Sequence, residues 1–147
     1  DFYKTKKRID DLVIYCCTSG YPVDVKDICL LEIKKLQEAT IGTKAEVGFS
    51  GHHLGISPDI AAVTLGAKWI ERHFTLDRTW KGTDHAASLE PDGLRRLCRD
   101  ITNIQKALTY KASEILPIEQ IQRNKLKKML SLGYKTYIIM DLCLLPK

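Results

Sequence analysis

Three short apolar runs alternate with three amphipathic segments, and this alternation restricts the fold more than any other feature of the sequence. The runs occupy residues 12–17, 45–50 and 68–75. The first run is almost entirely apolar, which is typical of a strand covered on both faces. Strands that alternate with helices are joined by right-handed crossovers and therefore run parallel. The sequence predicts an α/β fold with parallel strands, in either a barrel or an open doubly wound sheet.

Each predicted strand is followed by a segment with the features of a helix. Residues 27–38 place their apolar side chains on one stripe. Residues 58–65 begin with Pro58 directly after Ser57, a pair that suits a helix start. A third helix begins at Pro91, and its apolar stripe reaches Leu108. Beyond these, residues 118–131 look helical, and residues 137–145 are either a strand or a loose tail.

Composition and charge argue against several classes of protein. With 147 residues, 44% of them hydrophobic, the chain can form a domain with a core of its own. No stretch approaches the roughly 20 apolar residues of a membrane span. The net charge of +5 suits acidic partners, but the basic residues are scattered and lack the interleaved aromatic side chains of a nucleic-acid surface. We therefore expect neither a membrane nor a nucleic acid as partner.

The cysteines and the start of the chain bear on its cellular context. The five cysteines are odd in number and show no Cys-x-x-Cys spacing, which argues against a disulfide framework and a zinc ribbon. We interpret them as buried, reduced thiols, with Cys16 and Cys17 on opposite sides of a strand. Reduced thiols indicate a cytoplasmic protein. The chain begins with Asp1 and without the layout of a signal peptide, which suggests a cut chain.

Histidines follow two of the predicted strands, at the edge where parallel α/β folds place their active sites. His52 follows the second strand and His73 ends the third. Neighbouring strands lie about 4.8 Å apart, so both imidazoles can reach one cation at about 2.1 Å. The pair predicts an open divalent-metal site, although a single histidine at a strand end is more often an ordinary hydrogen-bonded residue. His53 points away from His52 and is expected to support the site from behind.

Other polar residues at the same edge suit a binding site. Glu71 shares a strand face with His73, where its carboxylate either orients a ligand or pairs with a buried cation. Ser19 and Ser50 lie in small-residue turns that suit an anion, or are simply tight turns. Asp84 lies in the long charged loop after the third strand, where it either accepts hydrogen bonds from sugar hydroxyls or forms a turn.

Several motifs, in this order, resemble the sialic acid synthase family, which comprises N-acetylneuraminate synthases and the related pseudaminic and legionaminic acid synthases. A set of separate motifs is far more specific than one short pattern. They are CTSGYP at residues 17–22, GFSGH at 48–52, LGAKWIERHFTLD at 65–77, WKGTDH at 80–85 and ASLEP at 87–91.

The resemblance implies part of a TIM (β/α)8 barrel, in which residues 12–108 supply strands six, seven and eight with their helices. A complete barrel needs about 250 residues. We therefore expect residues 1–112 to be the C-terminal part of a barrel and residues 113–147 to be a linker-like helix with an unassigned tail. The antifreeze-like domain of the family is expected to be absent from this chain, and the parent protein to be a homodimer.

The resemblance also implies a reaction. Family members condense phosphoenolpyruvate with N-acetylmannosamine, its 6-phosphate or a related N-acetylated amino-sugar, and they release a nine-carbon 2-keto sugar acid and phosphate with Mn²⁺ or Mg²⁺ bound. Glu71 is the candidate catalytic acid or base, with His53 as the alternative. The other implied roles are metal ligation by His52 and His73, contact with phosphoenolpyruvate by Ser19 and Ser50, and contact with the sugar by Tyr21 and Asp84.

The implied chemistry agrees with the residues, and three alternatives remain. A divalent metal that polarises the sugar aldehyde as a Lewis acid suits attack by a weakly nucleophilic enol carbon. The alternatives are another metal-dependent barrel aldolase or hydrolase with the same two histidines, a basic nucleic-acid-binding module, and a non-catalytic remnant. We expect the chain by itself to be inactive, because a partial barrel lines only part of the site.

Overall fold

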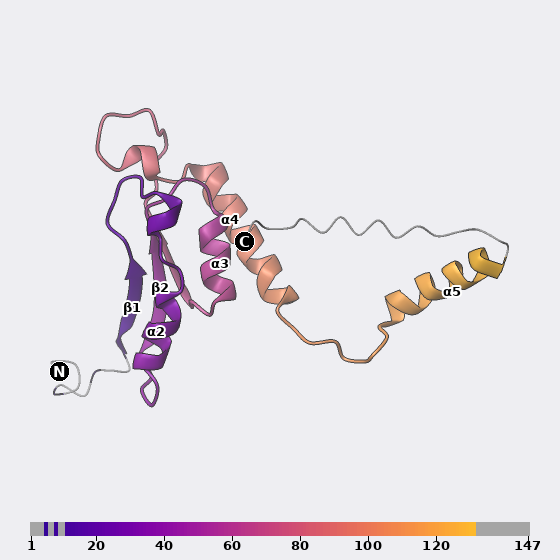
Figure 1. The fold of residues 1–147 in the computed structure, drawn as a ribbon. Helices are drawn as coiled ribbons and strands as arrows, with labels where there is room; N and C mark the ends of the chain where they lie inside the picture. Colours follow the sequence, from indigo (N-terminus) through magenta and orange to yellow (C-terminus); the bar gives the residue numbers. More distant parts are fainter. Residues whose placement is uncertain (1–4, 6–7, 9–10, 132–147) are drawn as a thin grey trace. The chain divides into compact units, whose positions relative to one another are not determined.

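The computed structural model describes residues 5, 8 and 11–131. It divides the chain into one unit that ends at Leu108 and a second that begins at Thr109. The first unit alternates strands and helices in the order β1, α2, β2, α3, β3 and α4, as Figure 1 shows. The strand or tail predicted for residues 137–145, and Cys143 within it, lie outside the described residues.

The strands form a three-stranded parallel sheet with β2 in the middle. They are β1 (Val13–Cys17), β2 (Glu46–Gly51) and β3 (Trp69–Arg72). The prediction of an α/β fold with parallel strands is confirmed. The register places Ser50 beside Cys17 on one side and beside Glu71 on the other, so the three carboxyl ends of the strands meet at one edge.

Helices cover one face of this sheet. Helix α2 (Glu32–Ala39) packs against β1 and β2, α3 (Ser57–Thr64) packs against β2 and β3, and α4 (Pro91–Ala107) packs against α3. Every second strand residue turns toward the helices because side chains alternate along a strand. The resulting core consists of Cys16, Ile28, Ile33, Val47, Phe49, Ala62 and Ala67.

The opposite face of the sheet is open in the described part of the chain. Trp69 lies on this face with 48% of its surface exposed, and its indole N–H donates to a carboxylate oxygen of Glu46. The Lys68 ammonium and the Trp69 N–H, both bonded to Glu46, hold the pKa of that carboxyl below its ordinary value. Glu71 is exposed while Arg72 is not, which confirms the predicted alternation of faces along β3.

Two predicted elements differ from the observed ones at their ends. The strand predicted for residues 68–75 stops at Arg72. The backbone beyond it pairs with Leu89 instead, because Leu89 N donates to His73 O at 2.8 Å and Thr75 N donates to Leu89 O at 3.0 Å. These bonds hold the segment near the start of α4. The helix predicted for residues 27–38 begins only at Glu32. It is preceded by a 3-10 turn and by Cys29, whose positive φ of 53° interrupts any helix.

The prediction of buried cysteines was wrong for three of the four described ones. Cys16 is buried and Cys17 is exposed, which confirms that they face opposite sides of β1, but Cys29 and Cys98 are also exposed. Cys17 lies on the open sheet face, and Cys29 lies in a surface turn. All four are free thiols. Burial raises the pKa of the Cys16 thiol, and the nearby Glu32 carboxylate adds to the shift.

The second unit contains helix α5 (Pro117–Ser131). Its bounds differ by one residue from those of the helix predicted for residues 118–131. Its apolar side chains Ile118 and Ile121 are exposed by 68% and 56%. Among residues 5, 8 and 11–131, no helix combines the length and the apolar character needed to cross a membrane.

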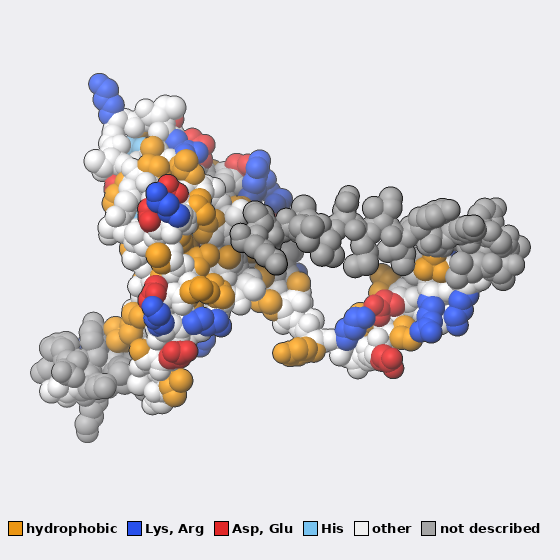
Figure 2. Space-filling view, in the orientation of Figure 1, with side chains coloured by type: hydrophobic (Ala, Val, Ile, Leu, Met, Phe, Trp, Pro, Cys, Tyr) orange, Lys and Arg blue, Asp and Glu red, His pale blue; other side chains and the backbone are white. Residues whose placement is uncertain are grey.

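Lysine and arginine side chains form separate groups on the molecular face that Figure 2 shows, rather than one continuous patch.

Candidate functional site

The imidazoles of His52 and His73 lie together where β2 and β3 end. Their ring centroids are 5.1 Å apart, with the rings inclined at 68°. Tyr21, from the loop after β1, lies against both rings, with centroid distances of 4.5 Å to His52 and 5.5 Å to His73. Residues from the loops after all three strands therefore converge, as the strand-end argument predicted.

The hydrogen bonding of His52 leaves one ring nitrogen for a ligand. Its Nδ1 lies 3.0 Å from the backbone oxygen of Thr18. A carbonyl oxygen can only accept, so Nδ1 carries the hydrogen and Nε2 keeps its lone pair. His52 as a whole is 5% exposed, and the fixed orientation of its ring is typical of a metal-ligating imidazole. Within the described part of the chain no group of three or more His, Cys, Asp or Glu side chains is placed to hold a metal ion.

Asp84 lies beside the second imidazole. Its Oδ2 is 3.6 Å from His73 Nδ1, and its Oδ1 accepts a hydrogen bond from Thr83 Oγ1 at 2.8 Å. The backbone oxygen of Asp84 also accepts from Ser88 Oγ at 2.7 Å. Asp84 thus belongs to the histidine cluster and shapes a turn at the same time, and its half-exposed carboxylate faces solvent.

Ser50 and Glu71 form a second contact on the open face of the sheet. Ser50 Oγ donates to Glu71 Oε1 at 2.8 Å. Of the two readings of Glu71, pairing with a buried cation is not what the structure shows, since its carboxylate accepts from a serine instead. Ser19 is exposed in the loop after β1, and among the described contacts no hydrogen bond joins its side chain to the rest of the site.

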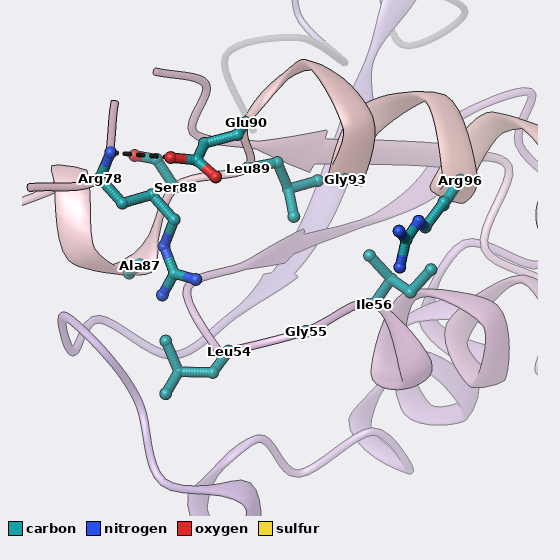
Figure 3. A pocket seen from close by; sticks show the side chains of 10 residues that line it. All are labelled: Leu54, Gly55, Ile56, Arg78, Ala87, Ser88, Leu89, Glu90, Gly93 and Arg96. Atoms are coloured by element: carbon teal, nitrogen blue, oxygen red, sulfur yellow. Dashed lines mark hydrogen bonds between the residues drawn. The ribbon is translucent and has the colours of Figure 1, made fainter. Parts of the chain in front are cut away.

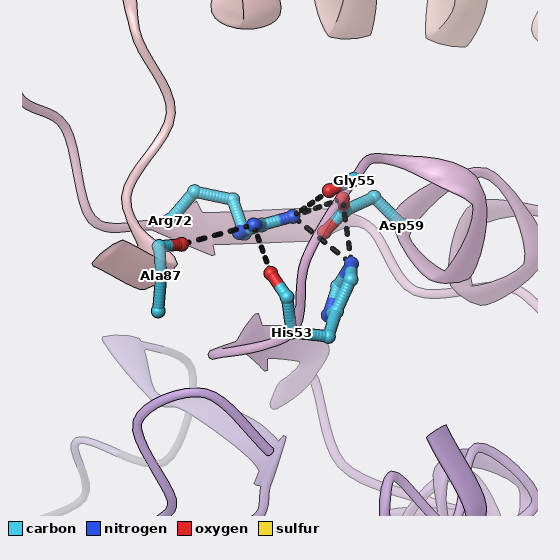
Figure 4. Close-up of polar contacts among 5 residues, drawn as sticks. All are labelled: His53, Gly55, Asp59, Arg72 and Ala87. Carbon is cyan, nitrogen blue, oxygen red and sulfur yellow. Dashed lines mark hydrogen bonds and ion pairs between the residues drawn. The ribbon is translucent and has the colours of Figure 1, made fainter. Parts of the chain in front are cut away.

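Sequence reasoning missed a buried network directly behind the histidine cluster. His53, Asp59 and Arg72 meet under the loop after β2, and their side chains are 1%, 0% and 3% exposed (Figure 4). Arg72 Nη1 lies 2.5 Å from Asp59 Oδ2, and His53 Nε2 lies 3.2 Å from the same oxygen. The available signal was an arginine on the apolar face of a strand, which requires a buried carboxylate partner.

The fourth histidine, His85, anchors the long loop that carries Asp84. Its Nδ1 lies 2.8 Å from Thr75 Oγ1, and this hydroxyl in turn donates to the backbone oxygen of Asp77 at 3.0 Å. Because the hydroxyl has one proton, His85 Nδ1 is the donor to Thr75. Hydrogen bonds from the Thr79 side chain and backbone hold the pKa of Asp77 below its ordinary value. The loop is therefore ordered by its own polar contacts.

A cavity of about 220 Å³ lies between the loop after β2 and the start of α4 (Figure 3). The guanidinium groups of Arg78 and Arg96 line it from different sides. Both are engaged, because Arg78 Nε donates to the backbone oxygen of Ala86 at 3.1 Å and Arg96 pairs with Asp92 at 2.6 Å. None of the predicted site residues lines this cavity, so it is separate from the histidine cluster.

Comparison with known proteins decides the family. Residues 3–113 match the sequence model of the NeuB family. The chain belongs to this family. The NeuB match spans all three strands and every predicted site residue, and it confirms the resemblance to sialic acid synthases.

Two relatives of this NeuB-family chain are named as synthases. It is 45% identical, over 76% of its length, to human N-acetylneuraminate-9-phosphate synthase, and 39% identical, over 86% of its length, to N,N'-diacetyllegionaminic acid synthase of Campylobacter jejuni. The matches cover 31% and 37% of these two proteins. The chain thus spans about a third of the length of its relatives.

A solved structure gives the same fold. The sialic acid synthetase of Leptospira borgpetersenii, determined in complex with citrate, matches with a TM-score of 0.67 and 32% sequence identity. The similarity covers 90% of this chain and 44% of that protein. The parallel α/β arrangement of the NeuB-family chain therefore agrees with a synthase of known structure.

Proposed function

We propose that the parent protein of this segment condenses phosphoenolpyruvate with N-acetylmannosamine, its 6-phosphate or a related N-acetylated amino-sugar. The products are a nine-carbon 2-keto sugar acid and inorganic phosphate. One observation carries the proposal: His52, His73 and Tyr21, contributed by the loops after three adjacent parallel strands, converge within 5.5 Å of one another. The names of the NeuB-family relatives support the same chemistry.

We propose further that the sheet is strands six to eight of a TIM barrel. The open sheet face and the helices on the other face support this, because barrel strands turn one face to the interior and the other to an outer ring of helices. Residues 1–112 would form this part of the barrel and residues 113–147 a linker with an unassigned tail. The parent would be a homodimer of the cytoplasm, where the four free thiols would stay reduced.

The imidazoles of His52 and His73 are the protein donors that we propose for a resident Mn²⁺ or Mg²⁺ ion. His52 Nε2 and the ring of His73 would be its ligands, with water and substrate oxygens at the other positions. Such an ion supplies Lewis-acid polarisation of the sugar aldehyde. The fixed tautomer of His52, which its bond to Thr18 imposes, orients that ring before a ligand arrives.

We assign substrate binding and proton transfer to different side chains of the site. Tyr21 and Asp84 would bind sugar hydroxyls, and Ser19 and Ser50 would hold the phosphate or carboxylate of phosphoenolpyruvate. As the enol carbon forms its bond to the aldehyde carbon, a proton must reach the new alkoxide, and water must add at the phosphate-bearing carbon before phosphate leaves. Glu71, bonded to Ser50, is the candidate for one of these proton transfers.

On the face that Figure 2 shows, the lysine and arginine side chains form separate groups, whereas nucleic-acid binding favours a continuous basic surface. Another metal-dependent barrel enzyme would use the same histidines but would turn over without phosphoenolpyruvate. Manganese-dependent phosphate release from phosphoenolpyruvate that requires the amino-sugar separates these functions.

The metal assignment is tested by His52→Ala and His73→Ala in the full-length parent protein. We expect each change to remove most of the bound manganese after gel filtration, because each deletes one of two protein ligands. Metal content is measured by mass spectrometry, with circular dichroism to check folding. Gln105→Ala, which changes an exposed polar residue of α4, is the control and should keep its metal. Unchanged manganese in both histidine variants would contradict the assignment.

A further inference from the structure

The side chain of Arg72 leaves β3 on the helix-covered face and contacts two separate loops. Its Nη2 donates to His53 O at 2.7 Å, and it reaches Ala87 O at 3.4 Å. Its Nη1 donates to Gly55 O at 2.9 Å and to Asp59 Oδ2 at 2.5 Å. Figure 4 shows the guanidinium between these groups. One side chain thus holds the loop after β2 and the loop before α4.

The imidazole of His53 lies against both charged groups. Its Nε2 is 3.0 Å from Arg72 Nη1 and 3.2 Å from Asp59 Oδ2. Depending on the tautomer, this nitrogen accepts from the arginine or donates to the carboxylate. In both cases the buried ring packs directly against the ion pair of Arg72 and Asp59.

The two loops that Arg72 joins carry residues of the proposed site. His53 directly follows His52, so the bonded carbonyl is adjacent to a proposed metal ligand. Ala87 lies in the short turn after Asp84, and its N–H donates to Asp84 O at 3.1 Å. A displacement of either carbonyl would therefore move His52 relative to Asp84.

We propose that Arg72, held by Asp59, is a positioning residue that fixes His52 and Asp84 relative to each other. This inference rests on the proposed function of those two residues. Arginine suits the task because its planar guanidinium presents five N–H donors in a fixed fork, whereas lysine has one compact ammonium with three. An ammonium can satisfy Asp59 but cannot span both loops.

A role in stability alone does not explain these contacts. A buried ion pair often adds little to stability compared with apolar side chains of similar volume. Here the guanidinium donates to three backbone carbonyls besides the carboxylate, and these carbonyls lie at His53, Gly55 and Ala87. The bonds to the carbonyls hold the geometry of the loops, and Asp59 balances the charge of the arginine that makes them.

The first test is Arg72→Lys in the full-length parent protein. We expect manganese affinity or kcat to fall at least about tenfold, as for other residues that orient a metal ligand. We also expect faster hydrogen–deuterium exchange in peptides covering residues 52–56 and 84–89 together. Arg95→Lys, which alters an exposed arginine paired with Asp92 on α4, is the matched control and should change neither readout.

The second test separates positioning from stability. Replacing the pair by Asp59→Leu with Arg72→Met removes both buried charges, so the double variant should unfold at a higher temperature than either single variant. Its kcat should remain at least about tenfold low, because the carbonyls have lost their donors. Recovery of wild-type kcat in this variant, or Arg72→Lys within twofold of wild type, would overturn the proposal.

The two proposals fail in different ways. If the wild-type parent shows no turnover that requires phosphoenolpyruvate and manganese, the proposed function is wrong. The exchange experiment still reports on Arg72 in that case, because it needs neither substrate nor metal. Exchange that rises in residues 52–56 but stays unchanged in residues 84–89 would show that Arg72 does not couple the two loops.

Discussion

The hydroxyl proton of Ser50 already has an acceptor, the carboxylate of Glu71 at 2.8 Å. A serine hydroxyl has one proton to donate and two lone pairs. An anionic substrate that approaches Ser50 therefore competes with Glu71 for this proton. The two side chains act as a pair. Loss of Glu71 would free the hydroxyl proton of Ser50 for a ligand, and loss of Ser50 would remove a hydrogen-bond donor from the carboxylate of Glu71.

Asp84→Ala and Ser50→Ala should differ in the substrate they affect. Asp84 lies beside His73 at the solvent-facing side of the cluster, so its loss should chiefly lower kcat/KM for the amino-sugar. Loss of Ser50 should chiefly lower kcat/KM for phosphoenolpyruvate. Each effect should be about 1–3 kcal/mol, the usual cost of one lost hydrogen bond in a buried site. Steady-state kinetics of the full-length parent, with each substrate varied in turn, measures both.

Asp100→Ala and Ser113→Ala are suitable controls for this experiment. Both residues are of the matching type. Asp100 pairs with Arg99 on α4, and Ser113 bonds within its own loop of the second unit. Their kinetics should stay near those of the wild type. Normal kinetics for both substrates in Asp84→Ala and in Ser50→Ala would rule out the assigned contacts.

The sequence placed some site residues well and could not place others. Strand ends and alternation bring His52 and His73 to one edge, and these two imidazoles do meet. The partners of a buried charge do not follow from local periodicity. Asp59 and Arg72 stand 13 residues apart on a helix and a strand. Alternation places Arg72 on the apolar face of β3, but it does not say which carboxylate pairs with it.

At the level of elements, the hydrophobic pattern was sufficient for the order and type of the main strands and helices. Each buried strand and each amphipathic stripe has a repeat that its burial enforces. The pattern failed where backbone bonds decide the geometry. The backbone of Leu89 forms hydrogen bonds with the segment after β3, and Cys29 has a positive φ before α2. Neither feature can be predicted from hydrophobic periodicity.

Gly51, the last residue of β2, lies where the structure has no room for a larger side chain. A Cβ at this position would lie 2.7 Å from His53 Cε1 and 2.9 Å from Phe49 Cε1. Gly51→Ala should therefore force the buried imidazole out of its place beside Asp59. We expect a loss of about 1–3 kcal/mol in the free energy of unfolding, the usual cost of overpacking a core. Urea unfolding of the parent protein, followed by fluorescence, measures it.

Gly20→Ala is the control for this change. The nearest atoms to a Cβ at Gly20 belong to Val23 and lie at ordinary contact distance, 3.5 Å. The free energy of unfolding should then change by no more than about 0.5 kcal/mol, as for most surface substitutions. Equal losses at Gly20 and Gly51 would show that steric contact with His53 is not the cause.

On the scale of the whole molecule, the described sheet has two edges and an open face. The strand order β1-β2-β3 leaves β1 and β3 each paired on one side only, within the part of the chain that the structure describes. Unpaired strand edges invite pairing with other chains. The open face carries the half-exposed Trp69 together with Ser50 and Glu71, so the same surface that would line a barrel interior holds residues of the proposed site.

The 147-residue chain, expressed alone, should therefore release no phosphate from phosphoenolpyruvate in the presence of N-acetylmannosamine and manganese. In the described sheet His73 and Tyr21 remain partly exposed, and both reactants would lack the groups that position them from the remaining strands of a barrel. Losing such positioning removes about 7–11 kcal/mol of catalytic advantage. The assay measures phosphate release by purified, monodisperse chain, with the full-length parent as positive control. Turnover of about 1 per second or more, an ordinary enzymatic rate, would show that three strands and their helices suffice for the reaction.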